Sequence, residues 1–330
     1  MVVPTPLVDP FARTVRDLRI SVTDRCNLRC TYCMPEDGLT WLPRADLLTF
    51  EEIERVARVC VERFGFDGIR ITGGEPTARA QLPVLVEKLT RLGVDVSLTT
   101  NGLSLRLLAD DLRAAGLRRL NVSCDTLRRR RFAEMTRRDD LPRVLDGIDA
   151  AVASGFDPVK VNCVLMRGVN DDEILDLASF GRRRGIVMRF IEFMPLDADG
   201  AWTTTSVVTL DEIVATISAV HPLEPVAEAG AAPARRFRYR DGAGEVGVVA
   251  SVSRSFCSTC DRVRLTADGQ FRSCLFAVRE TDLRAVLRAG GSDDDVAAAI
   301  EAEVGTKWAG HAIGQVHFTR PARSMSQIGG

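Results

Sequence analysis

The chain has 330 residues, of which 45% are hydrophobic and 27% charged, and its formal net charge is −1. This composition is typical of a globular protein with one or two domains. The near-zero charge and the 6% aromatic content argue against nucleic-acid binding, which needs a basic face and stacking aromatics. The sequence has no apolar run of about 18 residues and no apolar leader, so we expect a cytoplasmic protein with no membrane partner.

Short β-rich runs alternate with amphipathic runs from residue 18 to about residue 220. The expected strands cover residues 18–23, 68–72, 94–100, 117–123, 158–166 and 186–193, and the expected helices cover residues 50–65, 81–92, 104–115, 141–154, 171–184 and 209–219. Repeated strand–helix units imply a parallel sheet with helices outside it. A complete eight-fold barrel takes about 250 residues. The shorter pattern therefore predicts an α/β fold with a partial, TIM-like (β/α)6 barrel.

The pattern changes after residues 223–235, LEPVAEAGAAPAR, whose composition is typical of a linker. Short strands follow, together with two short helices near residues 280–304. We therefore expect a partial-barrel domain over residues 10–228. A smaller C-terminal α+β domain over residues 229–330 is expected to pack across the barrel mouth.

Nine cysteines in a chain without a secretion signal favour metal or redox chemistry over a disulfide framework. Six of them form two groups of three, with the spacings C-x3-C-x2-C and C-x2-C-x13-C. The groups are Cys26, Cys30 and Cys33, and Cys257, Cys260 and Cys274. Three thiolates can hold three irons of a [4Fe–4S] cluster and leave the fourth iron open to a ligand. A zinc site with a distant fourth ligand is the alternative at each group.

Other residues of chemical interest lie where expected strands end. The segment ITGGEP places Gly73 and Gly74 after the second strand, and glycines let a backbone approach a ligand closely. Thr99, Ser123 and Met194 also lie at strand ends, where functional residues of parallel barrels collect.

Basic residues give a second signal. Arg262 and Arg264 lie beside the second cysteine group, between Cys260 and Cys274, and arginine forks suit phosphate recognition, so an anionic substrate is expected there. Lysine is rare in this chain, which has 44 basic residues but only Lys88, Lys160 and Lys307 as lysines. Lys160 lies in an apolar strand, where a lysine is unusual unless it is paired.

Together these motifs closely resemble the GTP 3′,8-cyclases, a family of radical S-adenosylmethionine (SAM) enzymes that start molybdenum cofactor biosynthesis. The resemblance covers nearly the whole chain. It rests on LRISVTDRCNLRCTYCMP, IRITGGEP, SLTTNG, LNVSCDTL, VKVNCVLMRGVNDDE, RFIEFMPL, the second cysteine segment and the terminal IGG. The chain departs from the usual family pattern at Cys124 and Asp261.

The resemblance implies two [4Fe–4S] clusters, SAM as co-substrate and GTP as substrate. In that family a 5′-deoxyadenosyl radical removes the ribose C3′ hydrogen of GTP, and the C3′ radical then attacks C8. The product is (8S)-3′,8-cyclo-7,8-dihydroguanosine 5′-triphosphate. By position, the residues expected to contact SAM are Tyr32, Gly73, Gly74, Glu75, Ser123 and Met194. Those expected to contact GTP are Arg19, Arg70, Thr99, Lys160, Arg262, Val263 and Arg264.

The resemblance also implies that the terminal Gly329 and Gly330 reach into the active site and support catalysis. The implied partners are a second copy of the chain, a flavodoxin- or ferredoxin-like electron donor, and a downstream cyclic pyranopterin monophosphate synthase. Two alternatives stay open. One is another radical SAM enzyme with an auxiliary cluster, such as a peptide modifier, and the other is a zinc-dependent binding module.

Overall fold

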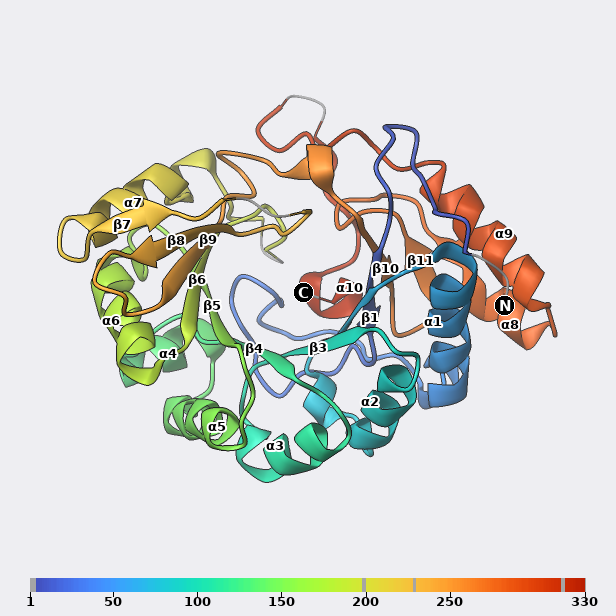
Figure 1. Cartoon of the computed structure of the whole chain (residues 1–330), viewed down its shortest axis with the longest axis horizontal. Helices are drawn as coiled ribbons and strands as arrows, with labels where there is room; N and C mark the ends of the chain where they lie inside the picture. Colours follow the sequence, from blue (N-terminus) through green and yellow to red (C-terminus); the bar gives the residue numbers. More distant parts are fainter. Residues whose placement is uncertain (1–3, 198–199, 228–229, 316–317, 330) are drawn as a thin grey trace.

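The computed structural model describes residues 4–197, 200–227, 230–315 and 318–329. Within these ranges the strands form one sheet in the order β12-β11-β10-β1-β2-β3-β4-β5-β6-β9-β8-β7. The six central strands, β1 to β6, run parallel to one another. In Figure 1 the sheet curves around an open centre, and helices cover its outer side. The expected α/β fold with a partial barrel is confirmed.

The central strands and their covering helices follow the expected order, with ends that differ from the expected ones by at most three residues, and the structure adds α4, which was not expected. The strands are β1 (Asp17–Ser21), β2 (Gly68–Thr72), β3 (Asp95–Thr100), β4 (Arg119–Ser123), β5 (Val159–Leu165) and β6 (Val187–Glu192). The helices are α1 (Phe50–Phe64), α2 (Leu82–Thr90), α3 (Leu105–Ala114), α4 (Arg129–Thr136), α5 (Leu141–Ala153), α6 (Ile174–Arg184) and α7 (Leu210–Ser218).

Local sequence explains where these elements begin and end. Helix α1 starts at a reciprocal capping box between Thr49 and Glu52, and it ends at Gly65, whose positive φ of 71° suits a glycine. Along the strands, apolar side chains such as Leu18 and Ile69 are buried against the helices. Their neighbours Arg19 and Arg70 point to the inner side of the curve, because successive strand residues face opposite ways.

The C-terminal part of the chain adds strands to both edges of this sheet. On the β1 side lie β10 (Arg262–Leu265), β11 (Gln270–Arg272) and β12 (Thr281–Asp282). On the β6 side lie β9 (Glu245–Val249), β8 (Arg235–Tyr239) and β7 (Leu223–Pro225). Helices α8 (Leu283–Arg288) and α9 (Asp293–Val304) lie beside α1 (Figure 1).

The prediction of a linker over residues 223–235 was therefore wrong at its start, where β7 pairs with β8. Pro225 is compatible with this pairing because β7 is an edge strand of the sheet. The domain division between residues 228 and 229 stays a prediction, and the strands on its two sides share one sheet.

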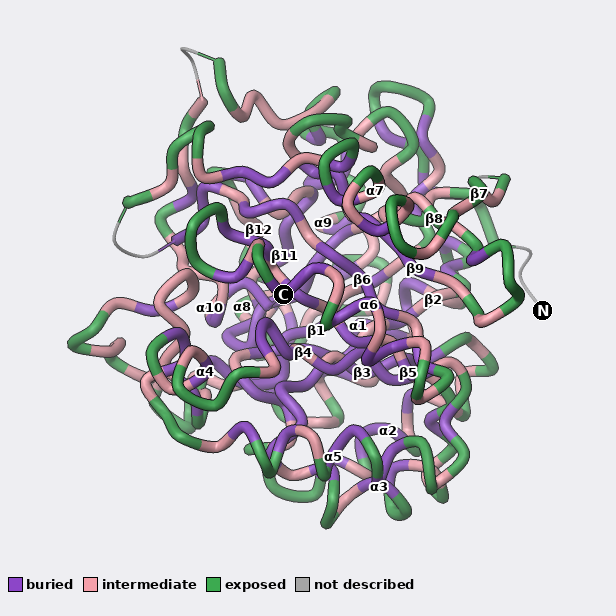
Figure 2. The backbone as a smooth tube through the Cα atoms, turned by 90° about the vertical axis from the view of Figure 1, so that its left-hand side faces the viewer, coloured by how far each residue is buried: buried purple, intermediate pink, exposed green. Residues whose placement is uncertain are grey.

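The last described helix, α10 (Met325–Ile328), lies in the open centre of the curved sheet, close to the C-terminus of the chain (Figure 1). Figure 2 shows buried backbone along the strands and exposed backbone in the outer loops and helix faces. Among the described residues, no helix has the length and apolar character needed to cross a membrane.

Candidate active site

Both cysteine groups line one cavity on the inner side of the sheet. The first group lies in the loop after β1, and the second lies between β9 and β12, more than 200 residues further along the chain. The six lining cysteines are Cys26, Cys30, Cys33, Cys257, Cys260 and Cys274. The spacing of the cysteines within each group can be read from the sequence. The two groups meet in one cavity because β10 pairs with β1.

The first cysteine loop rests on the glycine turn that follows β2. The Gly74 amide donates to Thr23 O at 2.7 Å, and the Glu75 amide donates to Arg25 O at 2.7 Å. A Cβ on Gly74 would lie 2.4 Å from the carbonyl oxygens of both Asp24 and Arg25. Only glycine fits this position, so the turn sets the height of the loop above the sheet.

Burial controls the ionisation of the first group. It raises the pKa of Cys26 to about 11 and that of Cys33 to about 12, and it raises the pKa of Cys30 well above its usual value. In the protein alone these groups are therefore neutral thiols at pH 7. A metal centre bound here must release three protons, because thiolates are the ligands.

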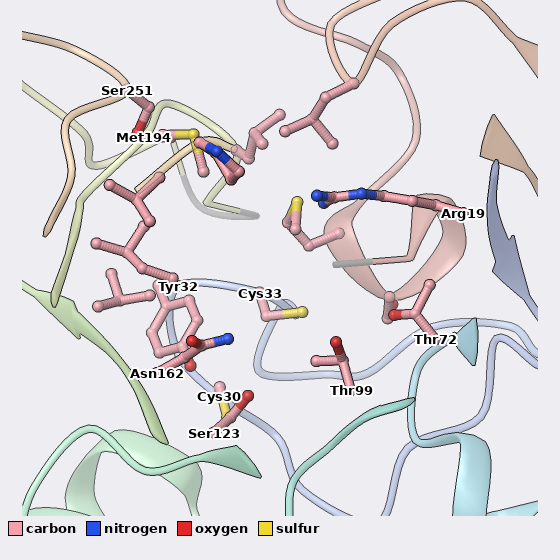
Figure 3. A pocket seen from close by; sticks show the side chains of 18 of the residues that line it. Arg19, Cys30, Tyr32, Cys33, Thr72, Thr99, Ser123, Asn162, Met194 and Ser251 are labelled. Carbon is pink, nitrogen blue, oxygen red and sulfur yellow. The ribbon is translucent and has the colours of Figure 1, made fainter. Parts of the chain in front are cut away.

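The residues expected to contact SAM all border this cavity. They are Tyr32, Gly73, Gly74, Glu75, Ser123 and Met194. Tyr32 donates its hydroxyl to Asp125 Oδ2 at 2.7 Å, which connects the cysteine loop to the end of β4. In Figure 3, Tyr32 and Asn162 lie on one side of the cavity, and the Arg19 side chain reaches in from the other side.

Glu75 is a special case among them, because its carboxylate is fully engaged within the protein. It accepts hydrogen bonds from the Thr77 amide at 3.0 Å, the Thr100 hydroxyl at 2.6 Å and the Asn101 amide at 2.6 Å. The side chain thus holds the turns after β2 and β3 together. Any contact of Glu75 with a ligand is left to its backbone.

A group of arginines, two of them buried and three half-buried, forms another part of the cavity wall. Its members are Arg19, Arg70, Arg189, Arg262 and Arg264. Burial, followed by repulsion from neighbouring arginines, lowers the pKa of Arg19 well below its usual value and that of Arg264 to about 10. Within the described part of the chain, Nε of Arg19 and two guanidinium nitrogens of Arg262 are buried without a hydrogen-bond partner. Such donors favour a multiply charged anion.

The sequence analysis missed Arg189, although a signal was present. Arg189 lies in β6 beside Asn162 of β5, and its Nε donates to Asn162 Oδ1 at 2.9 Å. It alternates with the buried Met188 and Phe190, in the same way that Arg19 alternates with Leu18 and Ile20. A count of inward-facing positions in every strand would have found it.

Two of the residues expected to contact GTP do not line the cavity. Val263 has its side chain in the hydrophobic core, between the lining residues Arg262 and Arg264. Lys160 lies in β5, where burial and the charges of Arg189 and Arg119 lower its pKa to about 8. Thr99 lines the cavity, as expected.

The C-terminal tail enters the cavity between β1 and β2. Gly329 has a φ of +86°, and a Cβ there would lie 2.8 Å from Thr72 Cγ2 and 3.1 Å from Ser21 Cβ. Arg264 donates a hydrogen bond to the Gly329 carbonyl oxygen. The sequence analysis expected Gly329 and Gly330 to reach into the active site. Gly329 lies beside Arg264, which lines the cavity, whereas Gly330 lies outside the described residues.

The second cysteine group differs electrostatically from the first. Burial alone would raise the pKa of Cys257, but hydrogen bonds from His311 and Ser255 bring it down to about 6. Burial likewise opposes ionisation of Cys260, yet Arg262 and Lys307 bring its pKa below the usual value. Asp261, one departure from the family pattern, uses its backbone oxygen to accept from the amides of Arg16 and Asp17.

Two family models match the chain in succession. One describes the radical SAM superfamily and covers residues 20–181, and the other describes a C-terminal region of molybdenum cofactor synthesis and covers residues 186–313. The chain is 49% identical to a GTP 3′,8-cyclase of Streptomyces coelicolor, over 98% of this chain and 96% of that protein. A GTP 3′,8-cyclase of Mycolicibacterium smegmatis is 48% identical, over 98% and 92%. The chain belongs to the GTP 3′,8-cyclase family.

Solved structures extend this comparison to the fold. The SAM-bound form of SuiB from Streptococcus suis matches this family member with a TM-score of 0.59 and 14% identity, over 87% of this chain and 68% of that one. SuiB with its precursor peptide SuiA matches with a TM-score of 0.61 and 14% identity, over 92% and 68%. At this level of identity the likeness concerns the radical SAM fold alone. The GTP 3′,8-cyclase resemblance expected from the sequence motifs is confirmed.

Proposed function

We propose that this protein is a GTP 3′,8-cyclase that converts GTP to (8S)-3′,8-cyclo-7,8-dihydroguanosine 5′-triphosphate, the first step of molybdenum cofactor biosynthesis. The observation that carries the proposal is one cavity lined by two three-cysteine groups and five arginines that are buried or half-buried. Each cysteine group could bind an iron–sulfur cluster, and the arginines could bind a polyanionic substrate between the two clusters.

The donor sets fit two [4Fe–4S] clusters. Each group offers three sulfurs to the same cavity, and a cluster takes each thiolate on a different iron. Among the described residues, no three His, Cys, Asp or Glu side chains are close enough to hold one metal ion together. The first cluster, when bound and reduced, supplies the chemistry that cleaves SAM to the 5′-deoxyadenosyl radical.

At the first cysteine group, the protein's own task is to position SAM. The glycine turn at Gly73 and Gly74 offers backbone atoms that no Cβ covers. Ser123, at the end of β4, supplies a hydroxyl group, and Tyr32 and Met194 supply apolar surface. Together these groups would orient the ribose of SAM toward the centre of the cavity.

At the arginine group, the task is to hold the triphosphate of GTP. Arginine stays charged even where burial lowers its pKa, and its fork binds two phosphate oxygens at once. Arg19 and Arg262 carry buried nitrogens that have no hydrogen-bond partner among the described residues, although Asp17 and Asp261 form longer ion pairs with the two Nε atoms, at 3.5 and 3.9 Å. Positive charge is also contributed from nearby strands by Arg70, Arg189 and Arg264. Lys160 adds to the positive electrostatic potential at this part of the cavity.

Two substitutions test the division of labour between the cysteine groups. Cys26→Ala should abolish formation of 5′-deoxyadenosine. Cys274→Ala should retain SAM cleavage and lose most of the GTP conversion. Both products are measured anaerobically by chromatography after reconstitution. Equal loss of 5′-deoxyadenosine in both variants, with the remaining cluster intact, would contradict the assignment.

Metal analysis tests the two clusters directly. Reconstituted protein should hold about eight iron and eight sulfide per chain if both clusters are cubanes. The Cys26→Ala and Cys274→Ala variants should each approach half of that content. An intact protein with about four iron, or one with zinc in place of iron, would refute the second cluster.

The tail is proposed to support catalysis by positioning. A chain that lacks Gly329 and Gly330 should keep its fold, both clusters and SAM binding, yet lose most of its GTP conversion. Small displacements of reacting atoms cost orders of magnitude in rate. If the chain without the two glycines converted GTP at the wild-type rate, the proposed role of the tail in catalysis would be refuted.

The remaining expectations rest on the family resemblance. We propose a homodimer in the cytoplasm that receives electrons from a flavodoxin- or ferredoxin-like donor. A cyclic pyranopterin monophosphate synthase would take up the product. Sedimentation of the anaerobic protein tests the dimer, and turnover with purified flavodoxin or ferredoxin tests the donor.

A further inference from the structure

The tail that enters the cavity is held by contacts at both of its ends. Helix α10 lies in the open centre of the curved sheet (Figure 1), and Met325 and Ser326 of this helix line the cavity. Its four residues form a single helical turn, which is not stable in isolation. The position of the tail therefore depends on the residues that attach it to the rest of the protein.

Arg323, two residues before α10, makes two forked ion pairs at once. Its Nε and one terminal nitrogen donate to the Glu280 carboxylate at 2.9 and 2.7 Å. Its two terminal nitrogens donate to the two carboxylate oxygens of Asp268 at 3.2 and 2.9 Å. The three side chains are between 12% and 26% exposed, so water screens these pairs less than a surface pair. Because guanidinium and carboxylate groups are planar, such pairs also fix the direction of the side chain.

The two acids that hold Arg323 have further partners near β11. Asp268 lies in the turn between β10 and β11 and accepts a hydrogen bond from the Thr266 hydroxyl at 2.5 Å. Glu280, just before β12, also pairs with the enclosed Arg272 of β11 at 2.7 Å. Since each acid has a second partner, the hairpin of β10 and β11 does not depend on Arg323 for its own structure.

The other end of the tail returns to the same hairpin. Arg264 of β10 donates to the Gly329 carbonyl oxygen. Arg264 is also one of the arginines proposed to hold the triphosphate, so substrate competes with Gly329 for its guanidinium group. Arg323 does not line the cavity and pairs only with acids outside it among the described residues. It is therefore the anchor that remains when substrate is bound.

We propose that Arg323 is a positioning residue of the reaction, whose two ion pairs hold the tail in the cavity. The inference rests on the proposed function in one respect, because the tail is taken to support conversion of GTP. Loss of Arg323 frees residues 324–329 and lowers the rate of conversion. The hairpin, the iron content and the binding of SAM stay as they are, because Arg323 acts only through the tail.

The first experiment measures the tail in metal-free protein by amide hydrogen exchange and mass spectrometry. The Ile328 and Gly329 amides donate to Ser324 O and Met325 O, so their exchange reports whether the tail is held. Arg323→Met removes the fork and keeps an unbranched side chain. Arg320→Met is the matched control, because the half-buried Arg320 belongs to the same segment and makes no ion pair within the described part of the chain.

We expect residues 324–329 to exchange about tenfold faster, or more, in Arg323→Met, since hydrogen bonds between charged groups contribute enough free energy for such a factor. Asp268→Asn keeps an acceptor for Thr266 and should speed exchange of the same residues. Exchange of residues 262–272, and all exchange in Arg320→Met, should match the wild type. Unchanged exchange of the tail in Arg323→Met would overturn the inference. An equal increase in residues 262–272 or in Arg320→Met would overturn it too.

The second experiment separates this inference from the proposed role of the tail. Reconstituted Arg323→Met should convert GTP about tenfold more slowly, or less, with unchanged iron content and an unchanged KM for SAM. The chain without Gly329 and Gly330 is measured beside it. If that shortened chain is fully active, the proposed role of the tail fails, and hydrogen exchange still decides whether Arg323 holds it. If the shortened chain is inactive but Arg323→Met turns over like the wild type, only the role of Arg323 is overturned.

Discussion

The two cysteine groups differ in how readily their thiols ionise before any metal binds. In the first group burial dominates, so Cys26 and Cys33 stay protonated far above neutral pH. In the second group, donors and cations outweigh burial at Cys257 and Cys260. Cys257 and Cys260 are therefore the better nucleophiles and the readier ligands at neutral pH, whereas burial raises the pKa of Cys274.

Alkylation of the metal-free protein checks this difference. The pKa of Cys257 is about 6, so its thiolate forms as the pH rises through 6 and is fully present at pH 8. The pKa of Cys26 is about 11, so its thiolate is scarce at pH 8. Iodoacetamide should label Cys257 at least tenfold faster than Cys26 at pH 8, as measured by mass spectrometry. Faster labelling of Cys26 would contradict the electrostatic account.

A glycine in the turn after β2 gives a second residue-scale prediction. Gly74→Ala places a methyl group on two backbone oxygens that cannot move aside. We expect the free energy of unfolding of the metal-free protein to fall by about 1–3 kcal/mol and the first cluster to bind poorly.

The matched control is Gly305→Ala. A Cβ there meets only ordinary contacts at 3.4 Å, and the φ of −59° suits any residue. Urea unfolding and iron content should match the wild type for this control. If both alanine variants behaved alike, close packing of Gly74 against the cysteine loop would not be the cause.

At the scale of elements, one buried carboxylate connects three segments around the cavity. Glu192, at the end of β6, accepts from the Leu210 amide at 2.9 Å and from the amides of Val252 and Ser253 at 2.7 Å each. Leu210 begins α7, and the other two residues lie in the loop between β9 and the second cysteine group. The position of that group therefore depends on a side chain in the parallel part of the sheet.

Glu192→Gln should loosen this connection without changing the size of the side chain. An amide cannot accept as strongly, and its NH2 group would face donors. Hydrogen bonds to a charged group contribute about 1.5–3 kcal/mol, so we expect a loss of stability of about 2–3 kcal/mol and easier loss of iron from the second group. Urea unfolding and timed iron release to a chelator measure both. Glu62→Gln, on the surface of α1, is the control and should change stability by less than about 0.5 kcal/mol.

The sequence predicted those parts of the site that depend on residue type and local spacing. The cysteine groups, the glycine turn and the order of central strands belong to this class. Glu192 does not, because its role comes from partners that are distant in the chain. The sequence analysis also missed β7 as an edge strand. The residues that pair with it, in β8, lie beyond the expected linker.

At the scale of the whole molecule, the second half of the chain protects both edges of the parallel sheet. Strand β10 pairs with β1, and β9 pairs with β6. A chain ending at residue 228 would expose both edges and would leave Arg19 and Arg70 without the opposite wall of the cavity. The predicted domain division thus gives a testable boundary.

We expect the 1–228 fragment to aggregate or to unfold, because its sheet lacks both edge partners. Size-exclusion chromatography and circular dichroism of the fragment, next to the full chain, provide the measurement. A monomeric fragment with native helix content would instead establish residues 10–228 as an independent domain.

The pairing of Asp17 with Arg262 also has a consequence for the time at which the protein is made. Ribosomes add about 5–20 residues per second, so β1 waits on the order of tens of seconds for β10 to emerge. During that interval the first cysteine loop is synthesised but its cavity is still open along one side. We expect a nascent chain to accept its first iron–sulfur centre from the assembly machinery in this window, before the last part of the polypeptide closes the entrance.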